Sequence, residues 1–92
     1  MSTDEQNAQF VETKRRLKRA RFDEAMLKQK LLGVSDRLKN IADILSSPEA
    51  TPDQVPDMPG EQQVRIWVKE LRETSARVAQ LAETVRAFEE NL

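Results

Sequence analysis

The feature that most constrains the fold is a repeat of apolar residues at alternating steps of three and four, which occurs twice along the chain. The first run consists of Phe10, Leu17, Ala20, Leu27, Leu31, Val34, Leu38, Ile41 and Leu45. The second run consists of Val64, Trp67, Leu71, Val78, Leu81, Val85, Phe88 and Leu92. Because an α-helix turns once every 3.6 residues, this spacing places each run along one face of a helix. The sequence therefore predicts two long helices.

The prolines all lie between the two runs, at positions 48, 52, 56 and 59. Proline interrupts a helix because it has no amide hydrogen and its ring clashes with the preceding turn. We therefore expect a single domain over residues 1–92, with a first helix over 3–46, a proline-rich loop over 47–60 and a second helix over 61–91.

Hydroxyl side chains indicate where local helical segments begin. Ser2 and Thr3 match residues that cap the start of a helix, so we expect the first helix to begin near Thr3. Thr51, with Gln54 three residues later, predicts one short helical turn inside the loop. Gly33 disfavours a helix by about 1 kcal/mol relative to alanine. The apolar repeat nevertheless keeps its phase through Gly33, so we expect the first helix to be continuous.

The loop is long enough for the second helix to return antiparallel to the first, which gives an all-α helical hairpin, or coiled coil. Two registers fit the repeat. Either Ile41 is level with Val64, or Leu45 is level with Trp67, and in both the first turns of the longer helix extend past the second helix. Glu24 interrupts the apolar repeat, where it either specifies the register or extends its side chain into solvent.

Apolar residues outside the repeat indicate more apolar surface than two helices bury. Broad apolar stripes are typical of bundles of three or four helices. We therefore expect two hairpins to form a four-helix bundle, as a homodimer, although scattered apolar residues are also normal on a protein surface. The expected interface consists of Phe22, Met26, Leu32, Gly33 and Ile44.

A basic tract without any acid occurs early in the first helix. Its bases are Lys14, Arg15, Arg16, Lys18, Arg19 and Arg21. Such a tract can neutralise phosphates, so nucleic-acid binding is the alternative function. Basic residues followed by leucine heptads resemble the arrangement in basic leucine zipper proteins, but residues 7–9 lack that family's paired alanines and the arginine that follows them. The opposing interpretation is neutralisation of the tract by Glu83, Glu89 and Glu90 of the returning helix, and the net charge of −1 favours it.

The composition argues against catalysis. The chain has no cysteine and no histidine, which removes thiolate nucleophiles, zinc–thiolate sites and the commonest general base. Glu49, Asp53, Asp57 and Glu61 lie in or beside the loop, where nothing would desolvate them. We expect no enzyme activity, no cofactor, no metal and no small-molecule substrate. The absence of cysteine, of a long apolar segment and of a basic, apolar leader predicts a cytoplasmic protein that does not enter a membrane.

The sequence therefore predicts a non-enzymatic protein–protein interaction module, serving assembly, adaptor or regulatory purposes. Its expected partner is a second copy of the same chain or another helical protein.

Overall fold

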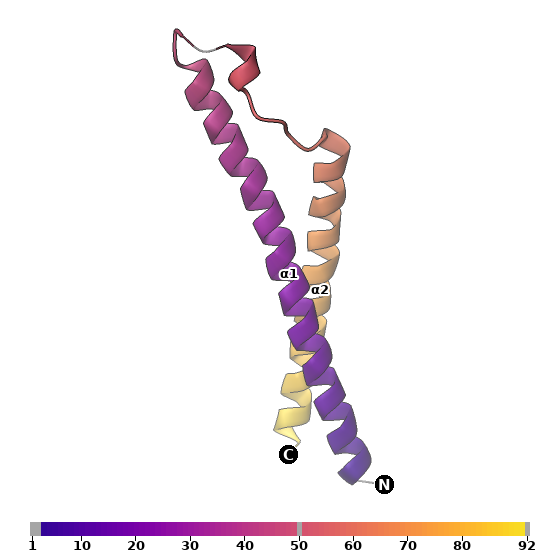
Figure 1. Cartoon of the computed structure of the whole chain (residues 1–92). Coiled ribbons are helices and arrows are strands. Elements are labelled where there is room, and N and C mark those ends of the chain that lie inside the picture. Colours follow the sequence, from indigo (N-terminus) through magenta and orange to yellow (C-terminus); the bar gives the residue numbers. More distant parts are fainter. Residues whose placement is uncertain (1–2, 50, 92) are drawn as a thin grey trace.

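The computed structural model describes residues 3–49 and 51–91. Helix α1 spans Thr3–Leu45 and helix α2 spans Glu61–Glu90, and the short 3-10 helix η1 spans Pro52–Gln54 between them. The described ranges contain no strand. The two long helices run antiparallel and contact each other, so the predicted helical hairpin is confirmed (Figure 1). The molecule is a rod that measures 73 × 20 × 14 Å.

Local chemistry explains where the helical segments begin and end. Helix α1 ends at Leu45, three residues before Pro48, and passes through Gly33 without a break, as expected. In the loop, the Thr51 backbone N–H donates a hydrogen bond to Gln54 Oε1 at 3.3 Å, which confirms the predicted short turn. Helix α2 begins after Gly60, whose backbone is extended. The predicted cap at Ser2 lies outside the described residues.

The register of the two helices differs from both predicted registers. The rings of Phe10 and Phe88 lie 5.7 Å apart, centre to centre, and Lys30 Nζ lies 5.6 Å from the centre of the Trp67 ring. These contacts place Val34, and not Ile41, level with Val64. Helix α2 is therefore shifted by one heptad toward the N-terminus of α1.

Pairing of polar residues in the seam between the helices explains this shift. In the observed register Glu24 of α1 faces Thr74 and Ser75, and Ser75 Oγ donates a hydrogen bond to Glu24 Oε2 at 2.6 Å. In the first predicted register Glu24 would face Leu81, and its carboxylate would lose that donor. Burying a carboxylate without a hydrogen-bond donor is costly, so the observed register is favoured.

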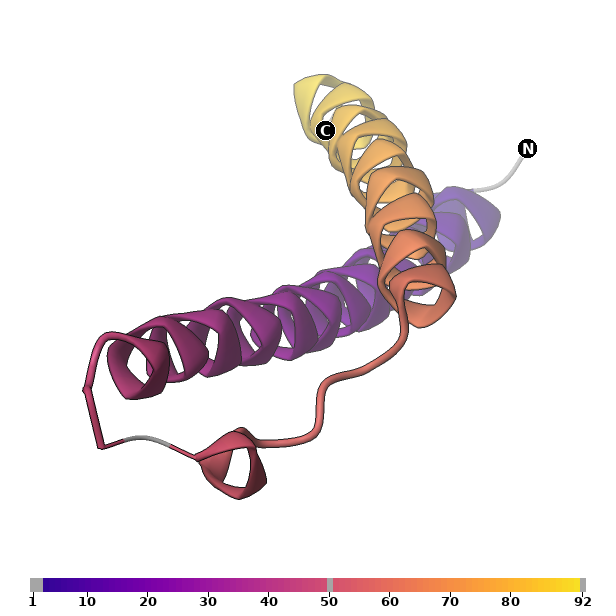
Figure 2. The same ribbon diagram turned by 90° about the horizontal axis from the view of Figure 1, so that it is seen from above.

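The shift also changes which end of α1 extends past α2. Phe88, near the end of α2, already reaches Phe10, so only the first turns of α1 extend at that end. At the other end, residues 38–45 continue past the start of α2 at Glu61, and the loop runs back along this gap (Figures 1 and 2). The N-terminal turns of α1 therefore extend past α2 as expected, but by fewer residues than predicted, and a second unpaired segment lies at the loop end.

The core is small and lies where the helices cross. The buried side chains among the described residues are Leu17, Ala20, Leu27, Thr74 and Val85. Toward the loop the helices diverge (Figure 1), and there Val64 and Trp67 remain half-buried. The two helices therefore pack closely in the half of the seam that holds these buried residues. In the other half, around Leu38 and Leu45 of α1 and Val64 and Trp67 of α2, they are separated, and we call this half the open seam.

Candidate interaction surfaces

The open half of the seam exposes apolar residues of the heptad repeat. Leu38 is 55% exposed and Leu45 is 68% exposed, although both occupy core positions of the repeat in α1. Their exposure follows from the register, because both residues lie past the start of α2 at Glu61, so α2 does not cover them. Sequence reasoning placed them in the seam and so did not identify them as exposed. The signal that could have identified them is the match between Glu24 and the hydroxyls of Thr74 and Ser75.

Three of the predicted interface residues are exposed in the single chain. Phe22 is 60% exposed, Met26 47% and Leu32 56%. The other two, Gly33 and Ile44, are half-buried. At about 100° per residue, Phe22, Met26, Gly33 and Ile44 project within about 40° of one another, whereas Leu32 lies about 80° from Phe22. Four of the five residues therefore share the side of α1 that lies away from the seam.

The basic tract of α1 is exposed along its whole length. Arg15 and Arg16 both pair with Glu12, at 3.7 and 3.3 Å, and Arg19 pairs with Asp23 at 3.6 Å. Each of these ion pairs joins residues of α1, and all the arginines involved remain mostly exposed. Exposed ion pairs contribute little free energy, because water already solvates both groups.

The remaining bases of the tract, Lys14, Lys18 and Arg21, form no ion pair in the described part of the chain. Lys14 Nζ lies 5.1 Å from the centre of the Phe10 ring. The tract therefore has both loosely paired and unpaired positive charges.

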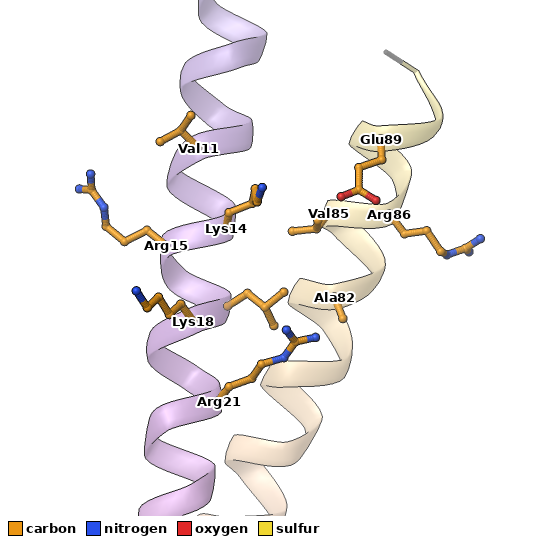
Figure 3. Close-up of a pocket in the computed structure, with 10 residues that line it drawn as sticks. Val11, Lys14, Arg15, Lys18, Arg21, Ala82, Val85, Arg86 and Glu89 are labelled. Carbon is orange, nitrogen blue, oxygen red and sulfur yellow. The ribbon is translucent and has the colours of Figure 1, made fainter.

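The acids of α2 do not form ion pairs with this tract. Glu83 and Glu90 both pair with Arg86 of their own helix. The Arg86 guanidinium donates hydrogen bonds to the Glu83 carboxylate, and this contact and its positive charge lower the pKa of Glu83. Glu89 lies in the same groove as Lys14 (Figure 3). The expected ion pairs between these acids and the tract are therefore not observed in the described ranges, although Glu89 shares a groove with bases of the tract.

Two open grooves follow the seam on either side of α1. The first has a mainly cationic rim and an apolar floor (Figure 3). It is lined by Val11, Lys14, Arg15, Leu17, Lys18, Arg21, Ala82, Val85, Arg86 and Glu89. The second is lined by Glu12, Arg15, Arg16, Arg19, Ala20, Asp23, Arg77 and Leu81. Helix α2 thus adds Arg77 and Arg86 to the bases of the tract.

We call this set of eight bases the cationic belt. It consists of Lys14, Arg15, Arg16, Lys18, Arg19, Arg21, Arg77 and Arg86. Sequence reasoning missed Arg77 and Arg86, because the distance between their helix and the tract depends on the register.

No group of three or more histidine, cysteine, aspartate or glutamate residues that could hold a metal ion occurs in residues 3–49 and 51–91. Within the same ranges, neither long helix is apolar enough to cross a bilayer. Glu49, Asp53, Asp57 and Glu61 are all exposed, and Glu61 pairs with Arg65 at 2.6 Å. Comparison with protein-family models, curated proteins and solved structures finds no match to this chain.

Proposed function

We propose that the protein is a non-enzymatic helical interaction module that self-associates, with two hairpins completing a four-helix bundle. The observation that carries this proposal is the exposure of Leu38 and Leu45, which occupy core positions of a heptad repeat and have no partner helix in the single chain. Core positions of a heptad repeat are stabilising when a second helix covers them.

The exposed area of the chain supports association. The chain exposes 7350 Å² to solvent. A compact monomer of 10.6 kDa exposes roughly 5,500 Å², so this chain has an excess of roughly 1,900 Å². Stable homodimers bury about 1,000 to 2,500 Å² of each chain. The excess area therefore has the size of one homodimer interface.

A second copy fits this surface because the unpaired segment is itself a helix with a heptad repeat. In a twofold arrangement, residues 38–45 of each α1 can pack against the open half of the other hairpin, since a twofold interface uses the same surface on both chains. The face with Phe22, Met26, Gly33 and Ile44 lies on the opposite side of α1 and is a second apolar surface that a neighbouring hairpin can cover. An assembly of this kind does not require catalytic residues on either helix.

Sedimentation equilibrium at micromolar concentration tests the proposal. We expect a mass twice that of the chain, and we expect Leu38→Gln/Leu45→Gln to shift the equilibrium to monomer by at least tenfold in Kd, which is about 1.4 kcal/mol. The matched control is Val11→Gln/Ile66→Gln, which removes two exposed apolar side chains outside the open seam and should leave the dimer unchanged.

Phe22→Gln/Met26→Gln tests the second face separately and should weaken the dimer as well. Circular dichroism establishes that each variant remains helical. A helical monomer for the natural sequence would overturn the proposal. A dimer that both Leu38→Gln/Leu45→Gln and Phe22→Gln/Met26→Gln leave intact would overturn the assignment of the interface to these surfaces.

A further inference from the structure

The hairpin concentrates positive charge in one narrow zone. Residues 11–23 of α1 and 76–87 of α2 lie side by side across the seam, and together they contain eight bases and three acids. The same chain has a net charge of only −1. The cationic belt is therefore a local feature of the fold that the overall charge conceals.

The opposite charge is gathered at the loop end. Residues 40–64 contain five acids and no base. An approaching polyanion is thus repelled from the loop end and attracted to the belt, which gives the rod an electrostatic polarity along its length.

The bases of the belt are positioned to meet an external ligand. Lys18, Arg21 and Arg77 form no ion pair in the described part of the chain. The bases of α1 line both grooves, and Arg15 contributes to each of them. They therefore form one continuous positive surface around the side of α1 that faces away from α2. The twelve steps from residue 11 to residue 23 extend about 18 Å along the helix.

We propose that the cationic belt binds the phosphodiester backbone of a nucleic acid, independently of its sequence. Six of its eight bases are arginines, whose planar guanidinium groups donate paired hydrogen bonds to phosphate oxygens. A duplex carries one negative charge per about 1.7 Å, so the length of the belt matches about ten backbone charges. A broad surface that reaches both grooves suits a duplex better than an extended acidic peptide, which one groove would accommodate.

The belt is separate from the open seam around Leu38 and Leu45, whereas Phe22 of the second proposed face directly follows Arg21 of the belt. Leu38 is seventeen residues from Arg21, which is about 25 Å along α1. Pairing of two copies through their open seams therefore leaves the belt exposed. Binding by the belt does not depend on the proposed dimer.

Fluorescence anisotropy with a labelled 20-base-pair DNA duplex, and with an RNA duplex of the same sequence, tests this proposal. With about four phosphate contacts, the affinity of the natural sequence should fall on the order of 100-fold between about 50 and 200 mM salt. Lys18→Gln/Arg21→Gln/Arg77→Gln should weaken binding about 10- to 100-fold and reduce the slope of log K against log salt by about two to three.

The matched control is Arg37→Gln/Lys39→Gln/Arg72→Gln. It also removes two arginines and one lysine, two of them from α1 and one from α2, and none of the three forms an ion pair in the described ranges. We expect it to change the affinity by less than about threefold, since none of its three bases lines either groove and Arg37 and Lys39 are more than a Debye length from Arg21 along α1. Equal weakening by both triple variants would show attraction by overall charge only and would overturn the proposal.

Two further results would also overturn it. The first is no binding to either duplex at low salt. The second is tighter binding to polyglutamate than to either duplex, which would assign the belt to an acidic protein surface. Self-association is measured separately, by sedimentation equilibrium of Lys18→Gln/Arg21→Gln/Arg77→Gln. This variant keeps Leu38, Leu45, Phe22 and Met26, so we expect it to remain a dimer even if the proposal for the belt fails.

Discussion

Ser75 Oγ donates a hydrogen bond to Oε2 of Glu24 across the seam between α2 and α1, at a distance of 2.6 Å. Glu24 occupies a position of the heptad repeat that an apolar residue usually fills, and its side chain is only 20% exposed. Lys28 Nζ, one turn away, lies 3.9 Å from its other carboxylate oxygen. A polar residue in a seam costs stability but specifies the register, and the pairing with Ser75 assigns this purpose to Glu24. The alternative, in which its side chain extends into solvent, does not occur.

We expect Ser75→Ala to destabilise the hairpin. The substitution leaves the Glu24 carboxylate mostly buried without its donor, which should lower the free energy of unfolding by about 1 to 3 kcal/mol. Urea denaturation followed by circular dichroism measures the change. The control is Thr84→Ala, which removes only a local hydrogen bond to the Gln80 carbonyl and should change the stability by less than about 0.5 kcal/mol. Equal effects of the two substitutions would contradict a special role of Ser75.

Disulfide formation tests the register directly, because the natural chain has no cysteine. Phe10→Cys/Phe88→Cys replaces two side chains that meet across the seam, so we expect an intramolecular disulfide to form under mild oxidation. Ile41→Cys/Val64→Cys is the matched pair for the first predicted register and should remain reduced. Mass spectrometry under dilute conditions reports both outcomes. A disulfide in the second pair and none in the first would restore the predicted register.

Gly33→Ala should stabilise α1. The backbone of Gly33 has a negative φ, and a Cβ at this position meets no atom within 4 Å, so alanine fits without strain. Alanine is preferred over glycine in a helix by about 0.5 to 1 kcal/mol, and thermal unfolding of dilute protein should show this gain.

The same variant tests the predicted close approach of a partner at Gly33. If a neighbouring helix packs on Gly33, the added methyl group should raise the Kd of the dimer while it stabilises the monomer. A stabilised monomer with an unchanged Kd would exclude Gly33 from the interface.

Arg86→Gln should raise the pKa of Glu83 toward its ordinary value. In the natural chain the hydrogen bond and the positive charge of Arg86 lower that pKa. A group whose pKa is lowered by folding stabilises the fold above its unfolded pKa, about 4.3 for glutamate, and loses this contribution as the pH falls through its folded pKa. NMR titration of the Glu83 side-chain carboxyl carbon measures the change, and Arg77→Gln serves as the control. An unshifted titration in the Arg86 variant would contradict the pairing.

The apolar repeat and the prolines were sufficient to predict the two helices and the turn between them. Helix formation depends on local spacing and capping, and both can be recognised in one sequence, as Thr51 and Gln54 show for the short turn in the loop. The bases of the candidate nucleic-acid surface on α1 were recognisable for the same reason, because they lie within eight consecutive residues. Arg77 and Arg86 were not, because they join those bases only through tertiary packing.

The sequence by itself determined which face of each helix is apolar and that the chain folds back on itself. Only the tertiary structure decided how far the helices slide along each other, and hence that Leu38 and Leu45 are exposed while Glu24 meets Ser75. The physical reason is that a heptad repeat is nearly unchanged by a shift of seven residues, and a long loop permits several such shifts. The choice among them depends on a single polar layer, whose hydrogen bond exists only once the two helices are in contact.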